Sequence, residues 1–548
     1  MSNSPESPTL FPEFFTQCLK SQGIDTIFGL VGDANLFLMD HFTRQPGNRY
    51  VSVTHEASAV LAASGYARAT GRLGVATVTH GPALTNTVTA LVENVRGRMP
   101  LLLIAGDTAV VDRENVQSVP QRDIIMPTGA GFEQVRAPET VGEDLAVAIR
   151  RAMLERRPVV LNLPADFQWA PVADATLPEV RWRSISAVAP DRNEMDSVSG
   201  LVASARRPLI LAGRGAIEDR SHKAVVELAE RLGAPLATTL QARDLFRGHP
   251  HNIGIFGTLS HDVALDVIGH ADCVIALGAS LNRWTTVEGG LLQGKRVIQA
   301  DRDPECLQRF QVVDATVLGD VEEVVRALLA DLDEIEAPST GFADEALERR
   351  LEARPAVVHP DWSTESTIDI RTALVEIESG FETDRTLVLD GGRFLPEVWK
   401  LISVQHPTDY IHTTHFGSIG LSLGNALGAC VASEKRTLLV TGDGGFMLGG
   451  LADFQAAVRH NLDITVVILN DSAYGAEHIQ FRRRDMDPAL SMFEWPSFAE
   501  LAKVMGAEGH EVTDMESLRA ALAAVAARRG PALIDVKLDP EKITRIDA

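Results

Sequence analysis

Two short segments in the C-terminal third place acidic and amide side chains where they can bind a metal ion and phosphate. Gly442-Asp443-Gly444-Gly445 follows an apolar run, and Asn470-Asp471 follows the next such run. Hard oxygen ligands of this kind suit Mg²⁺, which usually keeps coordination positions for phosphate oxygens. A glycine-rich turn before a helix offers N–H donors to the same phosphates. The two segments therefore predict a site for a magnesium-bound diphosphate.

Two strands and the helix between them must position these residues. Residues 438–440 and 464–469 are apolar runs of strand length, and apolar residues recur at helical spacing over 451–458. Neighbouring strands of a sheet lie about 5 Å apart, so Asp443 and Asn470-Asp471 can converge on one cation if these strands are neighbours. The alternative is that Gly-Asp-Gly is an ordinary connection between strand and helix.

The pairing of these motifs, followed by Tyr474-Gly475, resembles the cofactor motif of thiamine diphosphate enzymes. The resemblance covers essentially the whole chain and extends to the acetolactate synthase and 2-oxo acid decarboxylase superfamily, whose members have three α/β domains. It implies that Asp443, Asp471 and the backbone carbonyl of Ala473 hold Mg²⁺. The family pattern has Asn where this chain has Asp471, and counting from Asp443 selects Asn470 as the alternative ligand.

A glutamate in the N-terminal third carries the second part of the resemblance. Residues 50–53 are strand-like, Thr54-His55-Glu56 follows, and Gly65-Tyr66-Ala67-Arg68 lies further along. In this family a glutamate at that position bonds the cofactor pyrimidine and promotes the tautomer that removes the thiazolium C2 proton. The resemblance thus implies that Glu56 activates the cofactor. The alternative is a surface glutamate that caps the following helix.

Other residues match family positions that contact the cofactor. Ile419 matches the large aliphatic side chain that lies beneath the cofactor and enforces its V shape. Arg393, in Asp390-Gly391-Gly392-Arg393, stands where Gln is frequent, and a bidentate phosphate contact is expected of it. The predicted cofactor-binding residues are Arg393, Gly417, Ile419, Gly442, Gly444, Gly445 and Tyr474.

Three further residues bear on the reaction. Asp33, in the loop over 28–36, and Glu477 match catalytic carboxylates of pyruvate decarboxylase-like enzymes. The paired histidines of those enzymes are not apparent near residues 117–123, so His80 is the candidate replacement, with a merely packed histidine as the alternative. Residues 56–106 are more similar to acetolactate synthase. The resemblance implies decarboxylation of a 2-oxo acid to a cofactor-bound enamine, followed by protonation or carboligation.

Apolar runs alternate with amphipathic stretches along the chain, which predicts an α/β fold of three doubly wound parallel-sheet domains. The predicted limits are 1–180 for a pyrimidine-binding domain, 190–335 for a middle domain and 360–548 for a diphosphate-binding domain. Residues 170–192 and 335–363 are predicted linkers. Gly213-Arg214-Gly215 is a weak nucleotide signal, so FAD, a CoA-type nucleotide and no ligand all stay open for the middle domain.

Composition excludes several classes of partner. With 74 acidic and 51 basic side chains the formal net charge is −23, which disfavours nucleic acid. The chain shows no membrane-spanning or signal-peptide pattern, and its four cysteines lack metal-binding spacing. We expect a cytoplasmic enzyme that acts on a small 2-oxo acid, without a membrane partner. The resemblance adds a homodimer or homotetramer with each active site at a subunit interface.

Three alternatives to this function are kept. A lyase that cleaves a 2-hydroxyacyl-CoA uses the same cofactor, and a basic CoA pocket would distinguish it. A catalytically idle regulatory homologue retains only the fold, although the presence of Glu56, Asp443 and Asp471 argues against it. A flavin or nicotinamide oxidoreductase is the third, and an absorbance spectrum tests it.

Overall fold

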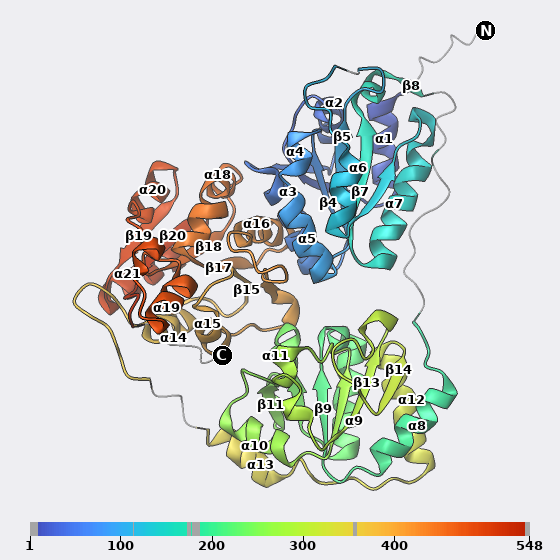
Figure 1. The fold of residues 1–548 in the computed structure, drawn as a ribbon, viewed down its shortest axis with the longest axis vertical. Helices are drawn as coiled ribbons and strands as arrows, with labels where there is room; N and C mark the ends of the chain where they lie inside the picture. Colours follow the sequence, from blue (N-terminus) through green and yellow to red (C-terminus); the bar gives the residue numbers. More distant parts are fainter. Residues whose placement is uncertain (1–8, 113, 173–176, 178–186, 355–358, 543–548) are drawn as a thin grey trace. The chain divides into compact units, whose positions relative to one another are not determined.

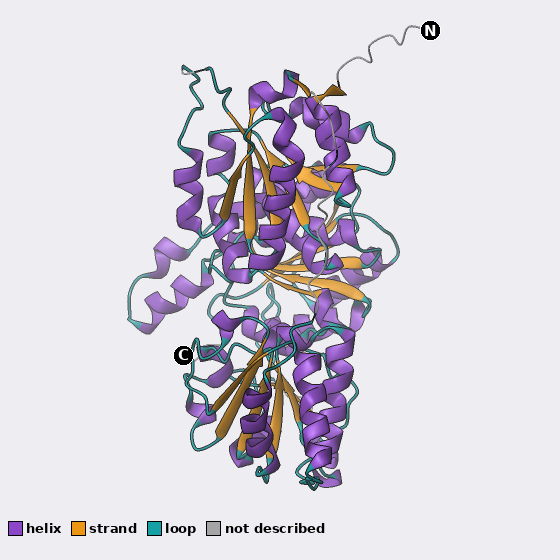
Figure 2. Cartoon of the chain, turned by 90° about the vertical axis from the view of Figure 1, so that its right-hand side faces the viewer, coloured by secondary structure: helices purple, strands orange, loops and turns teal. Residues whose placement is uncertain are grey.

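The computed structural model describes residues 9–112, 114–172, 177, 187–354 and 359–542. Three six-stranded sheets, each between layers of helices, make up most of this part (Figures 1 and 2). The predicted α/β class with three doubly wound domains is confirmed. No helix in the described ranges combines the length and apolarity that crossing a membrane requires.

The first sheet is parallel throughout and has the order β3-β2-β4-β5-β7-β6. Its strands are β2 (Thr26–Gly29), β3 (Arg49–Ser52), β4 (Gly74–Val78), β5 (Leu101–Asp107), β6 (Gly131–Gln134) and β7 (Pro158–Pro164). The helices are α1 (Phe11–Ser21), α2 (Leu36–Thr43), α3 (Glu56–Thr70), α4 (Pro82–Thr85), α5 (Val88–Gly97), α6 (Gln121–Ile125) and α7 (Val141–Glu155). A two-residue strand, β1 (Thr9–Leu10), pairs antiparallel with β8 (Pro171–Val172).

The middle sheet has the order β11-β10-β9-β12-β13-β14. Its strands are β9 (Pro208–Ala212), β10 (Leu236–Thr238), β11 (Asn252–Ile255), β12 (Cys273–Leu277), β13 (Arg296–Asp301) and β14 (Ala315–Leu318). The helices are α8 (Arg192–Ala203), α9 (Asp219–Leu232), α10 (Asp262–His270), α11 (Arg283–Thr286), α12 (Val321–Glu334) and α13 (Glu345–Glu352). The glycines of the 213–215 turn have a packing role: a Cβ on Gly213 would lie 2.2 Å from the carbonyl oxygen of Gly278.

The third sheet has the order β16-β15-β17-β18-β20-β19. Its strands are β15 (Arg385–Leu389), β16 (Tyr410–His412), β17 (Arg436–Gly442), β18 (Ile464–Asn470), β19 (Glu508–Val512) and β20 (Ala532–Lys537). The helices are α14 (Ile370–Gly380), α15 (Leu395–Leu401), α16 (Ser422–Ala432), α17 (Asp443–Gly445), α18 (Leu451–Arg459), α19 (Gly475–Arg483), α20 (Phe498–Val504) and α21 (Met515–Ala526). β18 is buried at every position, as a strand covered on both faces must be.

The linker predicted over 335–363 is wrong in part, because it contains helix α13. The charged sequence of this helix hides its one buried contact, Leu347, which joins the middle-domain core beside the partly buried Leu351. Parts of both predicted linkers, 173–176, 178–186 and 355–358, lie outside the described residues. The predicted domain limits therefore stay a prediction.

The first and third domains belong to one compact unit and share a continuous apolar core. Helix α3 packs on α16 within this core, and the two helices approach so closely that glycine is needed at the crossing. A Cβ on Gly65 would lie 2.0 Å from the carbonyl oxygen of Asn425, and one on Gly428 would lie 1.8 Å from that of Ala62. Any side chain at either position would push the helices apart.

Candidate functional site

The carboxyl ends of β15, β17 and β18 bring the predicted metal and diphosphate residues to one edge. The three strands are adjacent and parallel, with Gly442 at the end of β17 opposite Leu469 of β18. Asp390 follows β15, Asp443 follows β17 and Asp471 follows β18. Ligands of open parallel sheets bind at this edge. The two strands are neighbours, which is the condition for Asp443 and Asn470-Asp471 to converge, and the acids stand where a ligand is expected.

Asp443 and Asp471 are both buried, with exposures of 2% and 7%. The Asp443 Oδ2 accepts hydrogen bonds from the backbone N–H of Ala473, at 3.1 Å, and from Nε1 of Trp495, at 2.7 Å. Burial, and then the charge of Asp471, raise the pKa of Asp443 to about 7. Burial also raises the pKa of Asp471. A divalent cation would stabilise two neighbouring carboxylates that are buried away from water.

Asn470 and Asp471 point to different partners. The Asn470 amide donates to Oδ1 of Asp535 at 2.8 Å, and its side-chain oxygen accepts from the N–H of Ser472 at 3.1 Å. Ser472 has a φ of 52°, in the left-handed region that non-glycine residues rarely adopt. This turn carries the Ala473 N–H to Asp443. The arrangement supports Asp471 over Asn470 as the second side-chain ligand.

The glycines of the GDG turn make room for protein side chains. A Cβ on Gly444 would lie 2.5 Å from Cε1 of Tyr474, and one on Gly445 would lie 2.4 Å from Oδ2 of Asp390. Close packing therefore requires glycine at these two positions, and their contact with a ligand stays a prediction. A π-helical turn, Phe446–Gly450, continues α17 into α18, and such turns are frequent at functional sites.

Ile419 lies in a turn between two glycines in the left-handed region, Gly417 at φ 84° and Gly420 at φ 81°. Asp390 is completely buried and holds this turn, because it accepts from the N–H of Gly420 at 2.9 Å and from the Thr441 hydroxyl at 3.0 Å. Desolvation raises the pKa of Asp390. The side chain of Ile419 stands against Gly391, on the same edge as the acids.

Arg393 is fixed within the site. Its Nη2 donates to Oδ2 of Asp471 at 2.6 Å and to the carbonyl oxygen of Pro540 at 3.0 Å. Nη2 is thus engaged by the protein in the ligand-free chain, and the bidentate phosphate contact stays a prediction. Tyr474 packs its ring against that of Phe493, with centroids 4.6 Å apart, and touches Gly444.

In the first domain, three adjacent strands carry the other predicted residues. Asp33 follows β2, Glu56 follows β3 and His80 follows β4, so all three stand at one carboxyl edge. Glu56 is half-buried and its Oε2 accepts from the Asn86 amide at 2.9 Å. The cap of α3 is supplied by the ring of His55, which accepts from the Ala57 N–H. The capping alternative for the Glu56 side chain therefore finds no support.

Two buried acids tie the first domain to the third near this edge. Asp453 of α18 accepts from the N–H of Thr54, at 2.9 Å, and from the Ser58 hydroxyl, on either side of Glu56. Glu93 of α5 accepts from the N–H groups of His415 and Phe416, just before the Ile419 turn. These contacts hold both edges in fixed relation.

Within the described residues, no hydrogen bond joins Asp33, Glu56 or His80 to Asp443, Asp471 or Glu477. Asp33 is exposed and His80 is buried. Glu477 lies in the first turn of α19 and is exposed. The structure thus gathers the metal and diphosphate residues, and separately the first-domain residues, and leaves Glu477 apart.

Sequence reasoning missed two acids and a tryptophan that hold the site, namely Glu93, Asp453 and Trp495, and it quoted Asp390 only as part of the Asp390-Gly391-Gly392-Arg393 motif. Asp390 had a usable signal, since it follows an apolar run as Asp443 does. Asp453 and Glu93 have partners far away in the sequence, and their helical spacing gives no sign of them. Trp495 reaches Asp443 across a loop, which no local pattern reveals.

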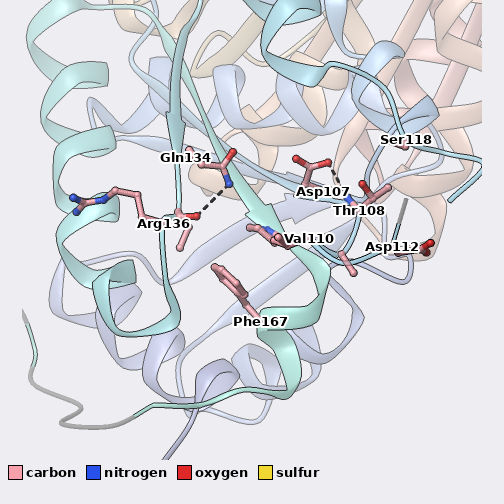
Figure 3. A pocket seen from close by; sticks show the side chains of 11 residues that line it. Asp107, Thr108, Val110, Asp112, Ser118, Gln134, Arg136 and Phe167 are labelled. Atoms are coloured by element: carbon pink, nitrogen blue, oxygen red, sulfur yellow. Dashed lines mark hydrogen bonds between the residues drawn. The ribbon is translucent and has the colours of Figure 1, made fainter. Parts of the chain in front are cut away.

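A pocket of about 570 Å³ lies further along the first-domain edge, beyond β5, and none of the predicted site residues lines it (Figure 3). Asp107, Gln134 and Phe167 are among its lining residues. Its polar groups largely bond one another, for instance Asp107 and Gln134 through the Asn162 amide at 2.6 and 2.8 Å. Nothing in the pocket calls for a particular ligand.

Comparison with known proteins matches all three domains. Residues 11–126 match the thiamine pyrophosphate enzyme N-terminal TPP binding domain, 195–328 the central domain and 390–536 the C-terminal TPP binding domain. The chain is 28% identical to a sulfoacetaldehyde acetyltransferase of Rhodobacter capsulatus, over 93% of this chain and 90% of that protein. It is 28% identical to a probable 2-ketoarginine decarboxylase of Pseudomonas aeruginosa, over 97% and 95%.

An oxalyl-CoA decarboxylase of Escherichia coli K12 is 26% identical, over 96% of this chain and 94% of that protein. Sequence matches over the whole length thus agree with three sheets and with acids at the carboxyl ends of adjacent strands. The chain belongs to the thiamine diphosphate (thiamine pyrophosphate) dependent enzymes of the acetolactate synthase and 2-oxo acid decarboxylase superfamily.

Proposed function

We propose that this enzyme uses thiamine diphosphate and Mg²⁺ to decarboxylate a 2-oxo acid, and then either protonates the product or joins it to a second carbonyl compound. The observation that carries the proposal is the pair of buried carboxylates, Asp443 and Asp471, at the ends of adjacent strands. Arg393 offsets the charge of Asp471, and the second buried carboxylate, Asp443, is costly without a metal ion to compensate it.

The donor set fits Mg²⁺ and a diphosphate. Asp443, Asp471 and the Ala473 carbonyl would hold the ion, and phosphate oxygens and water would complete its shell. When bound, the thiazolium of the cofactor supplies the electron sink for breaking the bond next to a carbonyl.

The chain's own residues have three tasks. Glu56 would hold a proton at the pyrimidine, with its carboxylate oriented by Asn86 at 2.9 Å. Ile419, braced through Asp390, would support the cofactor from below. Asp33, His80 and Glu477 are the candidates for moving protons at the substrate. Glu477 is exposed to solvent, so another segment of protein would have to cover it before a proton transfer there could exclude water.

The relatives support both limbs of the proposed reaction. One is named as a decarboxylase of a 2-oxo acid and one as an acetyltransferase, so protonation and group transfer are both represented. A 2-hydroxyacyl-CoA lyase is the second candidate, because another relative is named as acting on oxalyl-CoA. Binding of FAD or a CoA-type nucleotide by the middle domain is tested on the same purified protein that is used for the activity assays.

We expect CO₂ release from at least one member of a panel of 2-oxo acids when thiamine diphosphate and Mg²⁺ are supplied. Aldehyde as co-product would identify simple decarboxylation, and a hydroxyketone would identify carboligation. Oxalyl-CoA and a 2-hydroxyacyl-CoA are included in the panel to test the second candidate function, the acyl-CoA lyase. Turnover of an acyl-CoA substrate, with no activity on any 2-oxo acid, would replace the 2-oxo acid proposal. A separate absorbance spectrum of the purified protein shows whether a flavin is bound.

We also propose a cytoplasmic homodimer or homotetramer in which each active site combines two chains. The contacts described above between the first and third domains all lie within one chain. The proposal that an active site combines residues of two chains therefore needs its own test. Glu56→Gln and Asp443→Asn chains carrying different tags are co-expressed and the mixed oligomer is isolated. With shared sites, a mixed dimer has one intact site and about half of the wild-type activity. With sites inside single chains it has none, and that result would contradict the interface proposal.

A further inference from the structure

The candidate cation site contains a positive side chain as well as its two carboxylates. Arg393 and Asp471 are almost equally buried, at 8% and 7% exposure, and their side chains meet at 2.6 Å. A buried arginine of this kind offsets one carboxylate, and removing either partner leaves the other charge uncompensated.

The surroundings of the pair are closely built. The Pro540 carbonyl accepts from the same Nη2 at 3.0 Å, which fixes the guanidinium. Gly475 leaves just enough room, since a Cβ there would lie 2.8 Å from both Nε of Arg393 and Oδ2 of Asp471. The position of the arginine is therefore set on three sides.

One donor of Arg393 is left over. Its Nε is buried and has no hydrogen-bond partner among the described residues. Buried N–H groups in proteins are almost always paired, and a charged one is expensive to leave alone. The structure thus presents an unused, charged donor beside a carboxylate of the cation site, which points to an anionic ligand.

We propose that Arg393 and Asp471 act as one unit that tunes the cation-diphosphate site. Asp471 adds a second carboxylate for the cation, and Arg393 offsets that charge and donates Nε–H to a phosphate oxygen. This inference rests on the proposed cation site and deepens it. The two residues should therefore shift cation affinity in opposite directions when changed singly.

The test is a double-mutant cycle with Mn²⁺ as the probe, followed by electron paramagnetic resonance of the free ion. Asp471→Asn removes an anionic ligand and leaves the positive charge of Arg393 without its carboxylate partner. It is expected to weaken Mn²⁺ binding at least about tenfold. Arg393→Gln makes the site more negative and is expected to strengthen it about threefold or more. In Arg393→Gln/Asp471→Asn the affinity should return to within about threefold of wild type.

A second variant separates the charge of Arg393 from its Nε donor. Arg393→Lys keeps the charge, so Mn²⁺ affinity should stay near wild type. It loses the planar donor, so affinity for thiamine diphosphate at saturating Mn²⁺ should fall about tenfold, as read by tryptophan fluorescence. Thermal unfolding of each protein without ligands shows that it is folded and measures the coupling independently.

Arg519→Gln is the matched control, because it changes the net charge equally at an exposed pair with Glu376 in the same domain. It should leave Mn²⁺ affinity unchanged. Shifts of Mn²⁺ affinity of the same sign in both single variants, or additive effects of the two substitutions on ligand-free thermal stability, would overturn the pairing. Absence of Mn²⁺ binding in the wild type, even with thiamine diphosphate, would overturn the proposed cation site and the role of the pair with it.

Discussion

Replacing Glu56 with Gln is expected to slow the exchange of the thiazolium C2 proton of bound thiamine diphosphate by about 10²–10⁴-fold, the usual contribution of a positioned general acid or base. The glutamine amide cannot share a proton with the pyrimidine as the carboxyl group does. NMR of the cofactor after acid quench in D₂O measures this rate directly. The measurement needs no substrate, so it is independent of which 2-oxo acid the enzyme accepts.

The fold around Glu56 favours a clean result. His55 caps α3, and Asp453 holds Thr54 and Ser58, so the helix does not depend on the Glu56 carboxylate. Cofactor affinity and thermal stability should therefore change little. Glu500→Gln, at an exposed position, serves as the control for loss of one carboxylate. Wild-type exchange rates in Glu56→Gln would contradict the assignment of Glu56.

Much of the site was predictable because it lies where local patterns change. An apolar run predicts a buried strand, and a polar residue just after it predicts a group at the carboxyl edge of the sheet. Asp443, Asp471, Glu56, Asp33 and His80 all obey this rule. Sequence spacing alone also left Asn470 as a rival, and the hydrogen bond from the Asn470 amide to Asp535 supports Asp471 as the ligand.

The remainder depends on contacts between distant segments. Trp495 and Ala473 both reach Asp443, and Pro540 fixes Arg393, although none of these approaches leaves a trace in local periodicity. Strands β6, β10, β11 and β14 show the same dependence. They are short, with three or four residues each, and too few apolar positions separate them from loops. Short strands take their identity from the neighbours they pair with.

Replacing Asp443 with Asn is expected to stabilise the ligand-free protein and to abolish its stabilisation by Mg²⁺ and thiamine diphosphate. The amide keeps the shape of the side chain and an oxygen that accepts from Ala473 and Trp495. The substitution removes the buried negative charge of Asp443, which faces the carboxylate of Asp471 and has no metal ion to compensate it in the ligand-free protein. Such uncompensated buried charges are destabilising. Function and stability therefore oppose each other at this position, as is common in active sites.

The stabilisation should depend on pH in a definite direction. Burial and Asp471 raise the pKa of Asp443 from 3.8 to about 7, so the folded state holds its proton more tightly than the unfolded state does. The stability gained from that proton is complete below pH values near 3.8 and is lost as the pH rises through about 7. The asparagine variant has no such loss. Its advantage over the wild type should grow between about pH 4 and about pH 7 and level off at higher pH.

Thermal unfolding of both proteins, with and without the two ligands, measures these effects. Ligand binding to the folded state alone raises the wild-type midpoint by mass action, while the variant should show no shift at the same concentrations. Asp463→Asn provides a control, because this carboxylate pairs with Arg436 and Arg529 away from the site. It should lower stability and preserve the ligand shift. An Asp443→Asn protein that is less stable than wild type at about pH 8, yet still stabilised by the ligands, would show that Asp443 supports the fold and does not hold the cation.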